Sequence, residues 1–432
     1  MRSRYRRDIS TQTAPIVLSS HVRADDLATC ISCGLCLNDC PTYRVLGDEA
    51  DSPRGRVQLI RQMVTTDGAV DERVVGHLEA CLVCRACETA CPSGVPFGRI
   101  MEGAREDLRA RARPRRGAGA IRRLGLGTIV DPRRLRVATA LLDLYVRSGA
   151  QRVLRATRLL PTRLRTMDAL ALRSEGAPYV LVERRDADVA FFAGCIMRTA
   201  FGETERATVR MLERGGARVT ACREQTCCGA LHAHSGDGDT ARELARLNID
   251  AFSGTEGPIV VNAAGCGAQL KAYGELLAGD PAWTDRAHAF SARVRDASQA
   301  VPTDAVTSRA PRPIRVVYQD ACHLAHGQKI RREPRALLAA MPNVTIVPIA
   351  DAERCCGSAG IYNLTHPEVA GELQRQKVAA IQAARPDVVV SANPGCIIQI
   401  VAGLRAAGSD VPVVHLMRFL DDPSASLGAS EA

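Results

Sequence analysis

Sixteen of the 17 cysteines in this chain fall into repeated patterns. Eight of them form two copies of the run C-x2-C-x2-C-x3-C-P, and each cysteine of the second copy lies 51 positions after its counterpart. These eight are Cys30, Cys33, Cys36, Cys40, Cys81, Cys84, Cys87 and Cys91. Two intervening residues let a tight loop wrap three thiolates onto one compact core, and the run is the signature of bacterial ferredoxins, which bind 4Fe–4S clusters. Electron transfer is therefore the first hypothesis.

The fourth cysteine of each run points away from the other three and, in proteins with two such clusters, ligates the opposite cluster. We therefore expect two 4Fe–4S clusters, each with four thiolate ligands. The first set is Cys30, Cys33, Cys36 and Cys91, and the second set is Cys40, Cys81, Cys84 and Cys87. Zinc prefers two separated cysteine pairs, and disulfides need an oxidising compartment. The cluster interpretation is favoured over both.

The other eight patterned cysteines mark an internal repeat with a period of about 130 residues. The first copy has Cys195, Cys227, Cys228 and Cys266, and the second has Cys322, Cys355, Cys356 and Cys396. A glycine follows each adjacent pair, which permits close backbone approach. Four thiolates suffice for a further iron–sulfur cluster or for tetrahedral zinc. Redox-active or uncofactored thiols are the third alternative.

Four histidines lie close to these cysteines, namely His232, His234, His323 and His326. A role as ligand, proton donor or quinone contact competes with an ordinary role as a hydrogen-bonded structural histidine. No G-x-G-x-x-G follows a strand pattern, and no Walker motif is present. We therefore expect no flavin or NAD on this chain.

The elements that position the repeat cysteines follow from the hydrophobic pattern. Short apolar strands are expected at 189–193, 258–262, 315–318 and 387–390. Each precedes a patterned cysteine, and helical patterns such as 204–214 and 367–384 alternate with them. Strands alternating with helices predict parallel sheets, whose carboxyl ends build sites. Helices at 57–64 and 72–80 are expected to join the two cysteine runs.

The predicted fold class is therefore multidomain, combining α+β and α/β parts, and a length of 432 residues allows roughly two to four domains. Residues 20–105 form a small, mostly helical two-cluster ferredoxin-like domain, and residues 106–176 form a basic helical connector. Two tandem α/β cysteine-rich repeats are expected at 186–300 and 312–420.

The net charge of +10 is concentrated in the connector. Residues 103–173 contain 18 arginines, no lysine and five acids. Within them Leu135, Ala138, Leu141, Leu142 and Tyr145 recur at helical spacing. Either the connector packs on its neighbours with solvated arginines, or it docks on a membrane surface or a partner. Aromatic residues make up only 3%, so base stacking and a nucleic-acid partner are not expected.

Targeting signals are not evident. The apolar run 14–18 is too short for a signal-peptide core, and no stretch approaches the roughly 20 apolar residues of a membrane span. We expect a cytoplasmic protein, with a peripheral position on the cytoplasmic face of the inner membrane as an alternative.

Short motifs around the cysteines carry a family resemblance. They are Cys40-Pro41-Thr42-Tyr43, Gly47-Asp48-Glu49, Pro53-Arg54-Gly55-Arg56, Cys84-Arg85-Ala86-Cys87-Glu88, Cys91-Pro92-Ser93-Gly94-Val95, His326-Gly327-Gln328-Lys329, Cys355-Cys356-Gly357-Ser358-Ala359-Gly360, Leu364-Thr365-His366-Pro367, and Ala392-Asn393 before Gly395-Cys396. A two-cluster ferredoxin followed by two "CCG" repeats resembles the iron–sulfur subunit of glycolate dehydrogenase, also called glycolate oxidase. The resemblance covers about residues 20–420.

The resemblance implies an electron-transfer subunit beside FAD-containing subunits that oxidise glycolate to glyoxylate, with a quinone or other membrane acceptor. D-lactate and glycerol-3-phosphate systems use related proteins and are alternatives. Another alternative is a catalytic CCG site in a heterodisulfide-reductase-like complex. In those enzymes the repeat ends in C-x2-C, whereas Gln269 and Gln399 stand here at the second positions. A fifth thiolate is absent from both repeats, which speaks against that chemistry.

Overall fold

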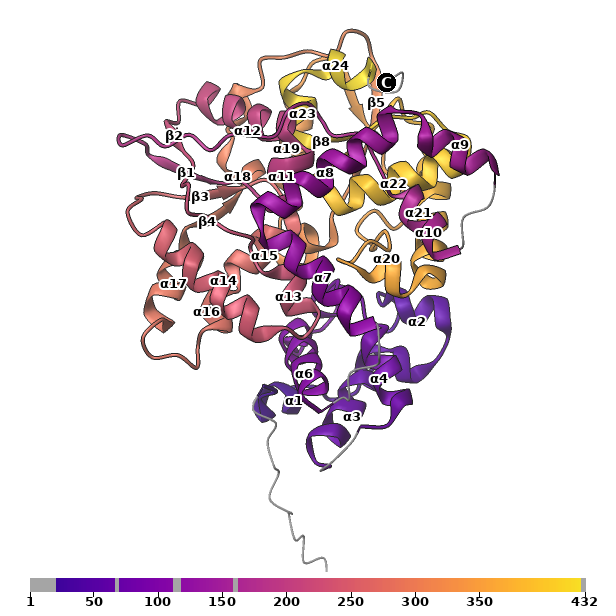
Figure 1. The fold of residues 1–432 in the computed structure, drawn as a ribbon. Helices are drawn as coiled ribbons and strands as arrows, with labels where there is room; N and C mark the ends of the chain where they lie inside the picture. Colours follow the sequence, from indigo (N-terminus) through magenta and orange to yellow (C-terminus); the bar gives the residue numbers. More distant parts are fainter. Residues whose placement is uncertain (1–20, 67–69, 112–117, 158–161, 429–432) are drawn as a thin grey trace, which may run out of the picture.

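The computed structural model describes residues 21–66, 70–111, 118–157 and 162–428. Figure 1 shows a helical N-terminal part at one end of the molecule, two α/β repeats beyond it, and connecting helices that run along the near side of the repeats. No helix in the described residues is long and apolar enough to cross a membrane.

The N-terminal part is helical, and its helices alternate with the cysteine loops. Its helices are α1 (Ala24–Ala28), α2 (Pro41–Leu46), α3 (Pro53–Val64), α4 (Glu72–Glu79), α5 (Ala86–Thr89) and α6 (Phe97–Arg111). Proline begins α2 and α3, as its fixed φ and missing N–H favour. Ile60, Leu78 and Met101 are fully buried in one apolar cluster that also contains Cys81 and Cys87. The helices expected at 57–64 and 72–80 are present as α3 and α4.

The described residues of the connector form four helices. They are α7 (Ala118–Val130), α8 (Pro132–Arg147), α9 (Ala150–Thr157) and α10 (Thr162–Ala169). Asp131 caps α8 by accepting hydrogen bonds from two backbone N–H groups. Of the predicted apolar stripe, only Leu135 is buried, whereas Leu141 and Leu142 are exposed. Of the two alternatives for this stripe, packing on neighbours describes Leu135, whereas the exposure of Leu141 and Leu142 leaves a docking role open for them.

The first repeat contains a parallel sheet of four short strands in the order β2-β1-β3-β4. The strands are β1 (Val189–Phe192), β2 (Val219–Thr220), β3 (Ile259–Val261) and β4 (Val294–Asp296). Its helices include α11 (Cys195–Ala200), α12 (Gly202–Arg214), α13 (Ala230–His234), α14 (Gly238–Ala251), α15 (Ala264–Lys271), α16 (Tyr273–Leu276), α17 (Thr284–Arg293) and α18 (Ala297–Ala300). After β1 the chain crosses to β2 on one side of the sheet, and after β3 it crosses to β4 on the other side. The carboxyl ends of β1 and β3 therefore mark the topological switch point.

The second repeat has the same topology, with strand order β6-β5-β7-β8. Its strands are β5 (Ile314–Gln319), β6 (Val344–Ile346), β7 (Val388–Ser391) and β8 (Val413–His415), all parallel. Its helical segments are the π-helix η3 (His323–Gly327), α19 (Arg332–Ala340), α20 (Tyr362–Thr365), α21 (Pro367–Ala384), α22 (Pro394–Ala406), α23 (Leu416–Asp421) and α24 (Pro423–Leu427). Mixed helices and parallel sheets agree with the α/β expectation. The domain boundaries at 20–105, 106–176, 186–300 and 312–420 stay predictions.

The two repeats share a core. Phe191 and Val260 of the first sheet lie in one apolar cluster with Val316 and Val388 of the second. The loops after β3 and β7 also meet, because Ala264 donates a backbone hydrogen bond to Ala392, 3.0 Å from N to O. The cysteines that follow these two strands are therefore brought toward one interface.

Arg56 anchors the loop between the two cysteine runs. It is only 1% exposed and forms an ion pair with Asp51 at 3.0 Å. It also donates hydrogen bonds to the hydroxyl of Thr42 and the carbonyl of His77. These contacts hold the segment that follows Cys40 against α4.

Replacement of Arg56 by Met should lower the free energy of unfolding by about 3–5 kcal/mol, because Asp51 would lose its buried guanidinium partner. Anaerobic urea denaturation would measure the loss. Arg73→Met is the matched control, since Arg73 pairs with Asp71 on the surface and should contribute little. Equal stabilities of the two variants would contradict the anchoring role.

Candidate iron–sulfur centres

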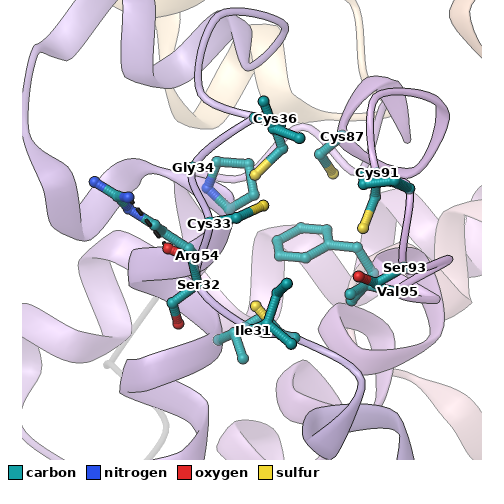
Figure 2. A pocket seen from close by; sticks show the side chains of 16 residues that line it. Ile31, Ser32, Cys33, Gly34, Cys36, Arg54, Cys87, Cys91, Ser93 and Val95 are labelled. Carbon is teal, nitrogen blue, oxygen red and sulfur yellow. Dashed lines mark hydrogen bonds between the residues drawn. The ribbon is translucent and has the colours of Figure 1, made fainter.

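Four thiols of the first predicted ligand set line one cavity. Cys30, Cys33 and Cys36 come from the loop before α2, and Cys91 comes from the turn after α5. Figure 2 shows the sulfurs of Cys33, Cys36 and Cys91 directed into this cavity, with Cys87 at its rim. The remaining lining is mainly apolar. Cys33 is exposed, so this cavity lies near the protein surface.

The second predicted set lines a second cavity, which lies deeper. Cys40 precedes α2, and Cys81, Cys84 and Cys87 lie between α4 and the end of α5. All four are buried. Cys87 lines both cavities. Cys91 of the second run lies with the first three cysteines of the first run, and Cys40 lies with the first three cysteines of the second run. This placement allows the expected exchange of the fourth cysteine, and the ligand assignment stays a prediction.

Both cysteine loops adopt left-handed backbone conformation at matching positions. Ser32 and Gly34 in the first loop have φ of 58° and 84°, and Val83 and Arg85 in the second have φ of 50° and 63°. The second pair lies 51 residues after the first, as the cysteines do. A positive φ at a β-branched valine is a true outlier, and such strain gathers at functional sites. The sequence pattern alone did not single out Val83 or Arg85.

Burial and neighbouring negative charge both disfavour the thiolate form of these cysteines when no cation is near them. Burial raises the pKa of Cys87 well above its ordinary value, and the charges of Cys84 and Cys81 raise it further. Burial also raises the pKa of Cys36 to about 11. Four thiolates this close repel one another unless cationic iron neutralises them. The backbone N–H of Val83 donates to the sulfur of Cys81 at 3.4 Å, a contact of the kind that tunes cluster potentials.

The four cysteines of the first repeat converge at the switch point of its sheet. Cys195 begins α11 after β1, Cys266 lies in α15 after β3, and Cys227 and Cys228 precede α13. The sulfurs of Cys195 and Cys227 are 3.6 Å apart. Hydrogen bonds from Cys195 and Cys228 hold the pKa of Cys227 well below its ordinary value. Gly229, next to the pair, has a φ of 83°, which a side chain would strain.

The second repeat repeats this arrangement. Hydrogen bonds from Cys355 and Cys396 hold the pKa of Cys356 well below its ordinary value, and a hydrogen bond to Cys322 raises the pKa of Cys355. Gly357 has a φ of 92°, and a Cβ there would lie 2.5 Å from the carbonyl oxygen of Ala370. Both repeats therefore bring their four predicted thiols together.

Two polar residues complete the second site. Burial lowers the pKa of Lys377, which lies close to Cys356 and donates to the carbonyls of Asp351 and Ala352. Asn393 donates to the sulfur of Cys396 at 3.4 Å and accepts from the backbone N–H of Gly265. Sequence reasoning missed Lys377 and named Asn393 only within a family motif, without a role. Lys377 had a detectable signal, because it occupies a buried position on the otherwise apolar side of α21.

The second repeat lies directly against the deeper ferredoxin-like cavity. Cys84 and Cys355 belong to one buried apolar cluster, against which Cys322 also packs. The charge of Cys322 contributes to the raised pKa of Cys84, after the larger effect of burial. Tyr362 adds a hydrogen bond to the carbonyl of Ala80. The second repeat is thus joined to the cysteine loop itself.

The four candidate histidines make structural hydrogen bonds. The Nε2 of His323 lies 2.9 Å from the carbonyl of Val83, and His326 lies between Thr89 and the carbonyl of Glu353. His232 contacts Asp237 and His234 contacts Glu102. Burial lowers the pKa of His323 to about 3, so its ring is neutral at physiological pH. These hydrogen bonds favour a structural role for the four histidines over a role as ligand, proton donor or quinone contact.

Comparison with known proteins identifies the segments. Residues 26–95 match the family described as a 4Fe-4S dicluster domain, and residues 189–271 and 316–401 match the cysteine-rich domain. Residues 117–171 match the linker region of the glycolate oxidase iron–sulfur subunit. The probable glycolate oxidase iron–sulfur subunit of Bacillus subtilis (strain 168) is 38% identical over 416 residues, which are 91% of this chain and 93% of that protein. The chain belongs to the glycolate oxidase iron–sulfur subunit family.

Other relatives place this family in context. The glycolate oxidase iron–sulfur subunit of Escherichia coli (strain K12) is 34% identical over 380 residues, covering 86% of this chain and 88% of that protein. Lactate utilization protein A of an Exiguobacterium species is 29% identical over 238 residues. That match covers 97% of the shorter protein but 54% of this chain. The recognised family resemblance is therefore confirmed over most of the chain.

The two predicted ligand sets can be separated experimentally. Cys36→Ala and Cys91→Ala should abolish the same reduced-cluster EPR signal, and Cys40→Ala and Cys84→Ala should abolish the other, each with a loss of about four irons. Spectra of anaerobically purified, dithionite-reduced protein would measure this. Cys222→Ala is the control, because Cys222 is buried outside all four sets. Loss of the same signal in Cys91→Ala and Cys84→Ala would refute the exchange.

Proposed function

We propose that this chain is the iron–sulfur electron-transfer subunit of a flavin-dependent glycolate dehydrogenase complex, which oxidises glycolate to glyoxylate and passes electrons to a quinone-type acceptor. Family membership supports the role in glycolate oxidation. The observation that best supports electron transfer is that three sets of cysteines lie next to one another, namely the two ferredoxin-like sets and the set of the second repeat. Cys87 lines both ferredoxin-like cavities, and Cys84 packs in one cluster with Cys355 of the second repeat.

The chain's own residues are suited to holding one-electron carriers. Bound in the two cavities, 4Fe–4S clusters would supply reversible one-electron redox centres. Cys30, Cys33, Cys36 and Cys91 would hold one, and Cys40, Cys81, Cys84 and Cys87 the other. Apolar side chains around the deeper set, such as Leu82 and Phe97, exclude water from it. A further cluster in a CCG repeat is part of this proposal. The convergence of four thiols in each repeat supports it, with the sulfurs of Cys195 and Cys227 3.6 Å apart.

The surface around the first cavity fits a docking partner. Ile31 and Leu35 flank Cys33 and are 71% and 61% exposed. Large apolar side chains next to an exposed thiol mark a place where an electron donor can approach closely. We assign this face to the FAD-containing subunits, which would bind both the flavin and the substrate. The complex would lie in the cytoplasm, peripheral to the inner membrane that contains the acceptor.

Glycolate should reduce the clusters only in the assembled complex. With partner subunits co-purified anaerobically, glycolate should bleach the visible iron–sulfur absorbance, whereas the separate chain should show no bleaching and no glycolate oxidation with an artificial acceptor. D-lactate is the matched alternative substrate. Faster bleaching by D-lactate than by glycolate would reassign the complex, and glycolate oxidation by the separate chain would contradict the division of roles.

Iron and acid-labile sulfide counts test the cofactor content. The intact chain should contain at least about eight irons, corresponding to two four-iron clusters. If a CCG repeat is loaded, the count should exceed this value and should fall again in Cys356→Ala while the ferredoxin-like EPR signals persist. A metal content dominated by zinc would refute the proposal.

A further inference from the structure

The connector helix α8 presents an uncovered apolar side. Leu135 is its only buried residue. Val137, Leu141 and Leu144 are 60%, 62% and 63% exposed. Their spacing of four and three residues places them on one side of the helix, over two turns. In an ordinary surface helix this stripe would be the one that faces the core.

Neighbouring connector helices add exposed apolar side chains. Leu124 on α7 is 69% exposed, Val153 on α9 is 65% exposed, and Leu164 and Met167 on α10 are 49% and 52% exposed. Figure 1 shows the connector helices on the near side of the molecule, in front of the repeats. Exposed apolar residues gathered on successive helices indicate an interaction surface rather than isolated surface leucines.

The charge of this segment selects the kind of partner. Residues 118–173 contain twelve arginines, no lysine and three aspartates. Each aspartate is paired within the segment: Asp131 with Arg134, Asp143 with Arg147, and Asp168 with Arg155.

Among the arginines of this segment whose side chains the structure describes, three have no acidic partner. Arg133, Arg136 and Arg152 are exposed and form no ion pair within the part of the chain that the structure describes. Two of them lie on α8 beside the apolar stripe. Uncompensated positive charge beside exposed leucines complements an anionic, apolar-cored surface, as amphipathic helices that lie in a lipid interface do.

We propose that α8, with α9 and α10, binds the surface of an anionic lipid bilayer in the plane of the membrane. Val137, Leu141 and Leu144 enter the boundary between headgroups and acyl chains, and Arg133, Arg136 and Arg152 contact lipid phosphates. The inference deepens the proposed function, on which it rests for the membrane location of the acceptor. A lipid surface is favoured over a protein partner because the apolar side chains are spread over separate helices with arginines between them.

Vesicle co-sedimentation of the anaerobically purified full chain tests the proposal. The chain should bind vesicles of phosphatidylcholine in which about one lipid in three is the anionic phosphatidylglycerol. This binding should weaken as the salt concentration rises. The triple variant Val137→Ser, Leu141→Ser and Leu144→Ser should bind about tenfold more weakly or worse. The variant Arg133→Gln, Arg136→Gln and Arg152→Gln should lose the preference for anionic vesicles.

A matched control separates a local effect from general loss of surface hydrophobicity. Val180→Ser, Val182→Ser and Leu247→Ser removes three exposed apolar side chains outside the connector and should bind like the parent. Circular dichroism and iron content should match the parent in every variant. Absence of parent binding, or equal binding by the α8 variant, would overturn the proposal. Loss of partner subunits from the α8 variant with unchanged vesicle binding would also overturn it, by assigning the surface to a protein.

Glycolate-dependent reduction of a soluble dye by the complex distinguishes this proposal from the proposed function. The α8 variant should retain dye reduction, because the three replaced side chains are exposed and line neither ferredoxin-like cavity. If the parent complex binds vesicles but does not reduce the dye with glycolate, the proposed function fails and the membrane surface stands.

Discussion

The close packing of buried thiols is the constraint on which the rest of this structure depends. Burial and neighbouring negative charge both oppose thiolate formation, as the raised pKa of Cys87 shows. A group of four such side chains can be ionised together only when a cation neutralises them, so cluster binding releases protons and adds its binding free energy to the folded state. The surrounding segments are held in place by buried polar contacts. The buried guanidinium of Arg56, for example, pairs with Asp51 and donates to the hydroxyl of Thr42, which fixes the segment that follows Cys40.

The two repeats have the same topology but are not equivalent in their surroundings. The second repeat packs its thiols against the loop that contains Cys84, and Tyr362 and His323 hydrogen-bond to the backbone of that loop. The first repeat contacts the N-terminal part mainly through charged and polar groups, such as Arg105, which donates to the carbonyl of His234. Electron exchange falls steeply with distance, so the apolar junction at the second repeat is the better-suited connection.

Local sequence patterns predicted the parts of this structure that depend on local spacing. The cysteine runs indicated the four thiols around each ferredoxin-like cavity, and the apolar runs indicated β1, β3, β5 and β7. The edge strands β2, β4, β6 and β8 are two or three residues long, and no expected strand was assigned to them. The partners of His323 and Tyr362 lie about 240 and 280 residues away, and no local pattern encodes such pairings. The apolar spacing on α8 left both packing and docking open, because periodicity identifies a stripe but not what covers it.

Asn393 links the two repeats through its side chain. Its amide donates to the sulfur of Cys396 and its carbonyl oxygen accepts from the backbone of Gly265, next to Cys266. One side chain therefore contacts the cysteine segments of both repeats. The corresponding position before α15 is Ala263, which has no side-chain donor or acceptor. The bridge is thus made from the second repeat only.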